Sequence, residues 1–232
     1  PLKYKYRYID GIPGAPEKPY FQLGKVIHKV LEIFHEENYT SYEDLINLLD
    51  SNWQEGGYKY EQEKEQNRQD AENMLKNYWD YIQLHPVNTL YTEHWFSFET
   101  DYAILSGKCD RIDLDENGNL SIVDYKTSKT PKTERQLKKD IQLGIYALFT
   151  SLNGVETSHK KNIKKIPEKL SMMFVREEVP EVAVELTHDD LDVIEENIRA
   201  TSDGIKKNNF IPCKGMHCDY CDYKELLCPL FG

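Results

Sequence analysis

The chain has 232 residues, 39% of them hydrophobic, and a formal net charge of -11 at pH 7. No apolar run approaches the roughly 18 to 20 residues that cross a bilayer, and the first residues do not resemble a signal peptide. We therefore expect a soluble, cytoplasmic chain without a membrane partner, folded as one large domain or as one domain with an appendage. The acidic balance weighs weakly against a polyanionic partner, so the placement of the basic residues matters more than their number.

Three helices are predicted in the first third of the chain. Residues 21–37 carry apolar side chains at the three- and four-residue spacings of an amphipathic helix. Residues 42–53 and 63–82 are predicted as two further helices, with Gly56-Gly57 as a break between them and Pro86 as the end of the last.

Strands are predicted next, over residues 92–100, 103–114 and 120–126. The last two are joined by a turn that contains Asn117-Gly118, which is a strong hairpin signal because both residues tolerate a positive φ. These strands are expected to form the centre of a sheet.

The remaining predicted elements are a helix over 132–151, two strands near 170–175 and 182–186, and a helix over 189–207. The predicted elements thus follow the order helices, strands, helices. We expect an α/β fold with a central mixed β-sheet flanked by helices, followed by a cysteine-rich C-terminal tail.

Charged residues end the apolar face of the predicted hairpin. Because strand side chains alternate, Asp124 and Lys126 share one face while Tyr125 points to the other. Antiparallel pairing through the turn brings Asp110 back toward both of them. Two carboxylates and one amine are therefore predicted to converge at one end of a sheet that is covered on both sides.

Metal-assisted hydrolysis is the chemistry that suits this arrangement. Oxygen ligands from two aspartates hold Mg²⁺ or Mn²⁺, which polarises a phosphate and lowers the pKa of a bound water. Lys126 would orient that water or stabilise the negative charge that develops during attack. The alternative is a surface ion pair between Asp124 and Lys126, with Asp110 as a turn residue, and D-x-K taken alone does not decide between the two.

Motifs elsewhere in the chain accompany the hairpin. G-x-x-D ends at Asp110, D-Y-K covers 124–126, and Q-x-x-x-Y places Gln142 four residues before Tyr146. Upstream, G-x-x-x-H ends at His28. Together these motifs resemble the RecB-like branch of the PD-(D/E)XK nucleases, AddB-type enzymes included, over nearly the whole chain.

The resemblance implies a restriction-endonuclease-like core with a metal-dependent active site. In such nucleases the histidine, both acids and the main-chain carbonyl between Asp and Lys bind the divalent ion, which implies His28, Asp110, Asp124 and the Tyr125 carbonyl as ligands here. An imidazole among the ligands favours Mn²⁺ more than an all-oxygen site does. Without the other motifs, His28 would be interpreted as an ordinary helix histidine.

Further candidates lie beside these ligands. Gln142 and Tyr146 share a helix face and are expected to contact a DNA phosphate or the attacking water, although they could instead cap the sheet. Glu93 either matches an acid that supports the site in this family or is a surface glutamate. A basic run next to the hairpin is expected to bind nucleic acid, through Lys129, Lys132, Arg135, Lys138 and Lys139.

The C-terminal segment contains four closely spaced cysteines, Cys213, Cys218, Cys221 and Cys228. A disulfide framework is not expected in a large intracellular protein, so the C-x2-C pair with a third cysteine indicates a metal or cluster site. The pattern resembles the iron–sulfur staple of AddB-type and CRISPR-associated adaptation nucleases, which implies a [4Fe-4S] cluster, with Zn²⁺ as the alternative. The fourth ligand is either Cys213 or a cysteine upstream of Pro1, with His217 as a possible substitute.

We therefore expect residues 1–212 to form a nuclease domain, with a helical part at 21–85 and the catalytic sheet and helices at 90–208, and residues 213–232 to form the staple. The expected activity is metal-dependent hydrolysis of DNA by an exonuclease of repair or recombination. Two alternatives stay open, a nuclease of CRISPR adaptation and an inactive DNA-binding module of a helicase–nuclease complex. The sequence contains no G-x-x-x-x-G-K-[ST] loop, so unwinding would need a helicase subunit or a further part of the chain.

Overall fold

The computed structural model describes residues 1–15, 19–53, 58, 60–157 and 160–231. Its backbone divides into two compact units, a larger one formed by Lys18–Glu196 and a smaller one formed by Pro1–Glu17 together with Asn197–Gly232. The predicted hairpin therefore belongs to the larger unit. All four clustered cysteines belong to the smaller unit, which combines the two ends of the chain.

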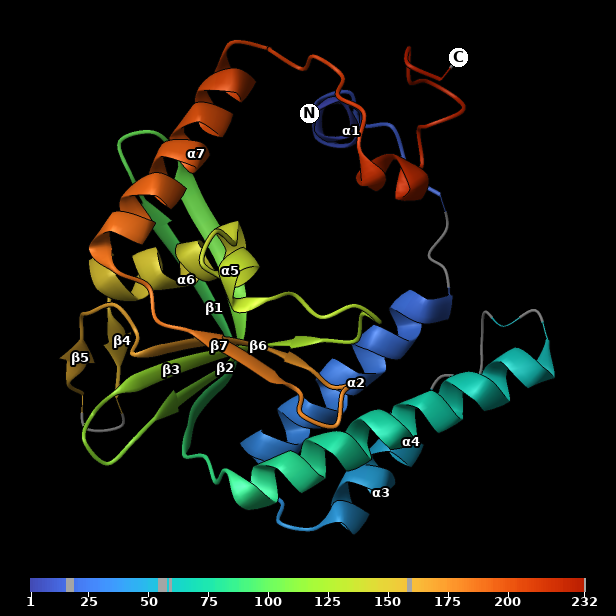
Figure 1. The fold of residues 1–232 in the computed structure, drawn as a ribbon, viewed down its shortest axis with the longest axis vertical. Helices are drawn as coiled ribbons and strands as arrows, with labels where there is room; N and C mark the ends of the chain where they lie inside the picture. Colours follow the sequence, from blue (N-terminus) through green and yellow to red (C-terminus); the bar gives the residue numbers. More distant parts are fainter. Residues whose placement is uncertain (16–18, 54–57, 59, 158–159, 232) are drawn as a thin grey trace. The chain divides into compact units, whose positions relative to one another are not determined.

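Three helices begin the larger unit (Figure 1), namely α2 (Pro19–Glu36), α3 (Tyr42–Asn52) and α4 (Glu61–Leu84). They form where the sequence predicts them, with ends within a few residues of the predicted bounds. Helix α3 begins at a capping box, in which Ser41 Oγ accepts the N–H of Asp44 and the Asp44 carboxylate accepts the N–H of Ser41. The predicted break at Gly56-Gly57 lies outside the described residues.

A five-stranded sheet forms the centre of the larger unit, in the order β1-β2-β3-β6-β7. Its strands are β1 (Thr89–Glu99), β2 (Ile104–Leu114), β3 (Leu120–Lys126), β6 (Lys169–Phe174) and β7 (Glu181–Val184). Strands β3 and β6 are parallel and the other neighbours are antiparallel, so the sheet is mixed. The predicted α/β fold with a mixed sheet flanked by helices is confirmed.

The single helix predicted over 132–151 is wrong. The structure has a short α5 (Glu134–Leu137) and a separate α6 (Ile141–Leu152), and Asp140 is the N-cap between them. The Asp140 carboxylate accepts the backbone N–H groups of Gln142 and Leu143 at 2.9 and 3.2 Å, which supplies partners that the first turn of a helix otherwise lacks. This cap fixes where α6 begins, and therefore where Gln142 lies.

The rest of the larger unit completes the layers. A small two-stranded sheet, β4 (Val155–Glu156) and β5 (Asn162–Ile163), follows α6, and α7 (His188–Lys206) begins after β7. Gly144 of α6 allows α7 to approach closely, because a Cβ added there would lie only 2.8 Å from Cδ1 of Ile194.

Helices cover both faces of the sheet (Figure 1). Helices α2, α3 and α4 cover one face, where Val123 and Tyr125 of β3 join their hydrophobic core. On the other side α6 packs against β1, with the ring of Phe149 stacked on that of Phe96 at 4.6 Å. None of the helices in the described ranges is both long and apolar enough to cross a membrane.

The smaller unit joins the two ends of the chain through tyrosines. Its helical elements are α1 (Leu2–Tyr4), the π-helical η1 (Lys5–Ile9) and the 3-10 helix η2 (Met216–Tyr220). The hydroxyl of Tyr6 donates to the carbonyl of Leu227 at 2.7 Å, and that of Tyr223 donates to the carbonyl of Ile12 at 2.7 Å. Sequence reasoning did not predict these first helical turns.

Candidate active site

The β2–β3 hairpin places its two aspartates at the end where the strands stop pairing. Pairing runs from Leu114↔Leu120 to Arg111↔Val123 and goes no further along β2. Beyond this point the Asp110 carboxylate, and not the β2 backbone, accepts the main-chain N–H of Tyr125, through Oδ2 at 2.7 Å. Asp110 is therefore held against the residue that follows Asp124, and both carboxylates are more than 90% buried.

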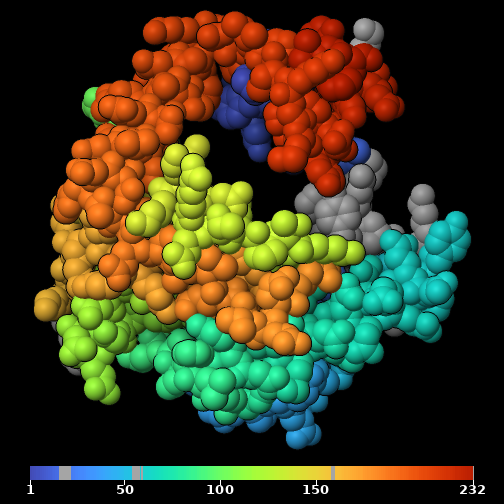
Figure 2. Space-filling view, in the orientation of Figure 1, coloured from blue at the N-terminus to red at the C-terminus, as the bar shows by residue number. Residues whose placement is uncertain are grey.

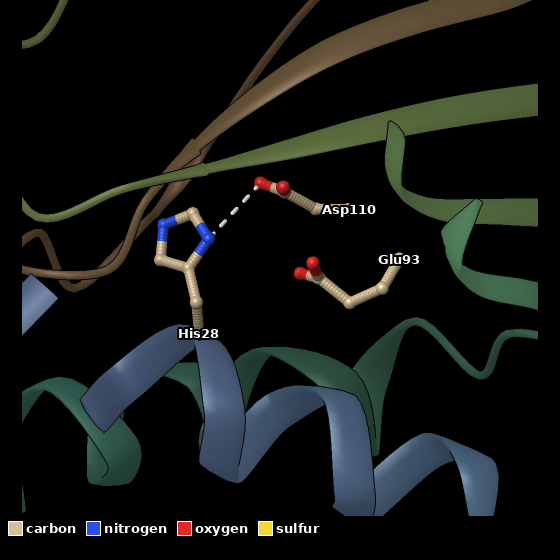
Figure 3. A group of neighbouring side chains, drawn as sticks. All are labelled: His28, Glu93 and Asp110. Atoms are coloured by element: carbon tan, nitrogen blue, oxygen red, sulfur yellow. Dashed lines mark ion pairs between the residues drawn. The ribbon is translucent and has the colours of Figure 1, made fainter. Parts of the chain in front are cut away.

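Three side chains from three elements point toward one another beside this end of the hairpin (Figure 3). His28 comes from α2, Glu93 from β1 and Asp110 from β2, and one ligand atom of each lies within 4.8 Å of the others. The Nδ1 atom of His28 is 3.4 Å from Asp110 Oδ2. One nitrogen and two carboxylates in this arrangement form a donor set for a divalent cation.

Glu93 reaches this group from an unusual backbone conformation. Its φ is +46°, inside a strand, where a residue with a Cβ is disfavoured at a cost on the order of 1–3 kcal/mol. Its carboxylate also forms an ion pair with Lys108. Backbone strain of this kind is common at ligand-binding positions, so the conformation is consistent with a carboxylate that is aimed at the group rather than at solvent.

Asp124 is surrounded by the other predicted residues. Its Oδ1 accepts a hydrogen bond from Gln142 Nε2 at 2.6 Å and lies 3.0 Å from the Tyr146 hydroxyl. Lys126 forms an ion pair with Oδ2 of Asp124 and donates to Gln142 Oε1 at 2.9 Å. Gln142 thus contacts both Asp124 and Lys126, while its amide also donates to the Tyr146 hydroxyl at 2.7 Å.

The second oxygen of Asp124 lacks an ordinary hydrogen bond. Among the described residues, Oδ2 is buried and accepts none with acceptable geometry, although the Lys126 ammonium lies against it. Burial raises the pKa of Asp124, and the nearby charge of Asp110 raises it further, which Lys126 offsets only in part. The nitrogen and carboxylate donors of His28, Glu93 and Asp110, next to the buried Asp124 carboxylate, fit a divalent metal ion.

The charge of the two aspartates also acts on His28. Burial by itself would lower the pKa of the imidazole, but the hydrogen bond and charge of Asp110, with a contribution from Asp124, raise it overall. The ring is therefore in a strongly negative environment, as a cation ligand would be.

A family model for the PD-(D/E)XK nuclease superfamily matches residues 1–229. The chain belongs to this superfamily. The match covers both units, and the confirmed fold is the one that the motif resemblance implies for such nucleases.

Solved structures provide a second comparison. A protein from Eubacterium rectale named "Putative exonuclease" is 16% identical with a TM-score of 0.54, over 94% of this chain and 79% of that one. The protein named SSO0001 is 16% identical with a TM-score of 0.40, over 100% of this chain and 96% of that one. At such identities the first likeness concerns the fold alone. No curated protein matches the chain.

Sequence reasoning missed Arg111, a buried residue of this nuclease that binds the hairpin to the helices on the covered face of the sheet. Arg111 is 1% exposed. It donates to the hydroxyls of Tyr78 and Tyr125 at 2.7 and 2.8 Å and forms an ion pair with Asp113, whose Oδ1 is 2.9 Å from Nε. His35 lies 3.2 Å from the same guanidinium. The alternation D-R-I-D, with an arginine facing the covered side of a buried strand, is the signal that could have identified it.

The basic run next to the hairpin is on the surface. In Figure 2 the lime-coloured segment of residues 126–139 stands out from the larger unit. Lys132 forms an ion pair with Asp140 at 2.5 Å. All five predicted cations are exposed, namely Lys129, Lys132, Arg135, Lys138 and Lys139.

The clustered cysteines line a cavity of about 50 Å³ in the smaller unit, together with Pro1 and His217. None of them forms a disulfide in the described part of the chain. Within the same ranges no three of their sulfur atoms lie as close together as the His28 group. A [4Fe-4S] cluster separates its ligands more widely than a single ion does, so the distances between these sulfur atoms do not test for a cluster. The cluster therefore stays a prediction.

Proposed function

We propose that the chain is a divalent-metal-dependent deoxyribonuclease whose active site is the end of the β2–β3 hairpin. The observation that carries the proposal is the group formed by His28, Glu93 and Asp110, beside the buried Asp124 carboxylate. Three carboxylates gather here against the ammonium groups of Lys126 and Lys108. A divalent cation, Mg²⁺ or Mn²⁺, would be attracted by this excess of negative charge and coordinated by the carboxylate oxygens.

The metal ligands in this proposal are His28, Glu93, Asp110, Asp124 and the main-chain carbonyl of Tyr125. When bound, the ion would polarise the scissile phosphate and lower the pKa of the attacking water. The chain's own task is to hold these ligands in place. The hydrogen bond from the Tyr125 N–H to Asp110 contributes to this, because it joins β2, which holds Asp110, to β3, which holds Asp124.

Lys126 and Gln142 act on the reacting phosphate and water in this proposal. The Lys126 ammonium, held by Asp124 and by Gln142 Oε1, would stabilise the negative charge that develops on the phosphate oxygens. Gln142 fixes Lys126 and Asp124 relative to each other, and Tyr146 fixes the amide of Gln142. The exposed cations of 129–139 would bind the backbone of the DNA on either side of the scissile bond.

We further propose that the enzyme is an exonuclease that acts at DNA ends in repair or recombination, with a helicase as a possible partner. The motif resemblance to the RecB-like branch supports this, and the name of the Eubacterium rectale protein agrees with it. For the smaller unit we propose a [4Fe-4S] cluster, or Zn²⁺, on Cys218, Cys221 and Cys228. The fourth ligand would be Cys213 or a cysteine upstream of Pro1.

The test is cleavage of end-labelled single-stranded and duplex DNA with Mg²⁺ or Mn²⁺, comparing wild type with Asp124→Asn and Lys126→Ala. Each change is expected to lower the rate by at least about 100-fold, because each removes a charge that acts in the transition state. Asp80→Asn, which removes a carboxylate from the exposed face of α4, is the matched control and should cleave as wild type does.

A ladder of products that shortens from one labelled end would identify an exonuclease and its polarity. Cleavage retained in Asp124→Asn would refute the proposed site. A wild type that binds DNA but cleaves none with either metal, in a preparation whose cysteine site is filled, would favour the inactive DNA-binding module instead.

A further inference from the structure

Charge is divided unevenly between the two units. The smaller unit contains eight Lys and Arg residues against six Asp and Glu, a net charge of +2, whereas the larger unit has a net charge of -13. A nuclease must hold a polyanion, and its active site lies in the unit that repels one overall. The smaller unit is therefore where an additional contact with substrate would meet least repulsion.

The first helical turns of the smaller unit present an exposed row of aromatic rings. The rings of Tyr4 and Tyr8 lie 5.1 Å apart, and the Tyr4 ring stacks on Phe210 at 6.3 Å with 18° between the planes. Tyr8 is 66% exposed and Tyr4 40% exposed, whereas Phe210 is buried beneath them. Tyr6, between the two, turns inward instead, where its ring meets Tyr223.

Cations accompany this row. Arg7 is exposed, its guanidinium lies 5.9 Å from the centre of the Tyr8 ring, and no carboxylate of the described residues forms an ion pair with it. Lys3 is also exposed, with only a long contact of 3.9 Å to Asp222. Exposed rings next to exposed cations are the combination by which proteins bind single-stranded nucleic acid, since bases stack on the rings and phosphates contact the cations.

We propose that the face formed by Tyr4, Arg7 and Tyr8 is a binding site for single-stranded DNA. The proposal rests on the proposed function for its substrate class. Unpaired bases stack on Tyr8 and on Tyr4, while Arg7 and Lys3 bind the adjacent phosphates. A duplex interior is not the ligand of this face, because its bases already stack on one another and offer no free ring surface.

The first experiment measures binding of a fluorescent single-stranded oligonucleotide by anisotropy, with the full-length protein and with EDTA present so that no cleavage occurs. Stacking on one aromatic ring is worth about 1–3 kcal/mol, so Tyr4→Ala/Tyr8→Ala should weaken binding by at least about 25-fold. Tyr4→Phe/Tyr8→Phe keeps both rings and should bind within about threefold of wild type. Tyr60→Ala, which removes a ring that is 73% exposed on the larger unit, is the control and should leave affinity unchanged.

Two further readouts separate stacking from general charge. Wild type should bind an oligonucleotide with abasic sites more weakly than the normal strand. The double alanine variant should bind the two oligonucleotides with equal affinity. Arg7→Gln should reduce the slope of log affinity against log salt by about 0.7, the value for one phosphate contact on a single strand. Tyr8→Ala alone provides a variant whose ring is too exposed to be needed for folding.

Wild-type affinity in Tyr8→Ala and in the double alanine variant would refute the proposal, as would a loss that Tyr4→Phe/Tyr8→Phe shares. Equal weakening of single-stranded and fully duplex DNA would also refute it. These outcomes are independent of the nuclease proposal. If the tyrosine variants lose binding but still cleave short strands, the loss concerns this face and not the catalytic site. If wild type binds single-stranded DNA but cleaves none, only the proposed catalytic site is contradicted.

Discussion

Replacement of Arg111 by methionine should destabilise the larger unit more than the replacement of a charged residue on its surface does. Arg111 is fully buried and compensates the charge of Asp113, which is itself only 8% exposed. It also donates to two buried tyrosine hydroxyls, on Tyr78 and Tyr125. Methionine fills much of the same volume but leaves the Asp113 carboxylate buried without its cation.

The expected cost in unfolding free energy is about 3–5 kcal/mol, the range for breaking a buried ion pair by removing one partner. Replacing both partners, as Arg111→Met/Asp113→Leu, should cost much less, because apolar residues of similar volume often substitute for a buried pair without loss. The control is Arg68→Met. Arg68 also contacts two carboxylates, Asp50 and Glu72, but on the surface, so we expect a cost of about 0–1 kcal/mol.

Urea unfolding followed by tryptophan fluorescence measures these costs. All three tryptophans, Trp53, Trp79 and Trp95, lie in the larger unit, so the signal reports on that unit. A cost below about 1 kcal/mol for Arg111→Met would show that Arg111 does not compensate a buried charge on Asp113. So would a double variant as unstable as the sum of the two single ones.

Three more predictions concern the same unit. Burial and the neighbouring guanidinium of Arg111 lower the pKa of His35 from 6.5 to about 3, so below pH 6.5 the unfolded chain binds a proton that the folded chain does not. The free energy of unfolding should therefore fall by up to about 1.4 kcal/mol per pH unit from about pH 6.5 toward pH 3. In urea titrations at several pH values, His35→Gln should remove this dependence. Gly144→Ala should cost about 1–3 kcal/mol because the new methyl group overlaps Ile194, and the cost combined with Ile194→Ala should be less than the sum of the two. Gln142→Leu should lower the single-turnover cleavage rate about 10–100-fold, since Asp124 and Lys126 lose the amide that holds them.

Each of these has an outcome that contradicts it. A flat stability profile between pH 6.5 and 4 in wild type would contradict the account of His35. Gly204→Ala is the control for Gly144→Ala, because the nearest atom to its added Cβ is 4.0 Å away, and equal effects of the two changes would contradict the close approach of the helices. An unchanged cleavage rate in Gln142→Leu would leave that residue without a role in the site.

Local signals predicted much of the fold. The Asn117-Gly118 turn predicted the pairing of β2 with β3, and apolar spacing located α2. The prediction of a single helix over 132–151 was wrong because Asp140 is an N-cap, at which a separate helix begins. Capping competes with periodicity, and here the cap determines the helix boundary.

The candidate site was predictable as a set of residues but not as an arrangement. The motif resemblance named His28 and Asp110, whose approach depends on tertiary packing of α2 against the sheet. The burial of Arg111 could not be inferred from its type, since arginine is mostly exposed unless it is paired. The positive φ of Glu93 and the pairing of the two chain ends are long-range results that no local pattern contains.

Direct titration of Mn²⁺ into the metal-free protein by calorimetry tests whether the hairpin end binds a divalent cation. We expect wild type and Asp80→Asn to bind Mn²⁺, and Asp110→Asn and Asp124→Asn to bind it at least about tenfold more weakly, because each loses a charged ligand. Mn²⁺ binding of equal strength in wild type and in both site variants would contradict binding at the hairpin end.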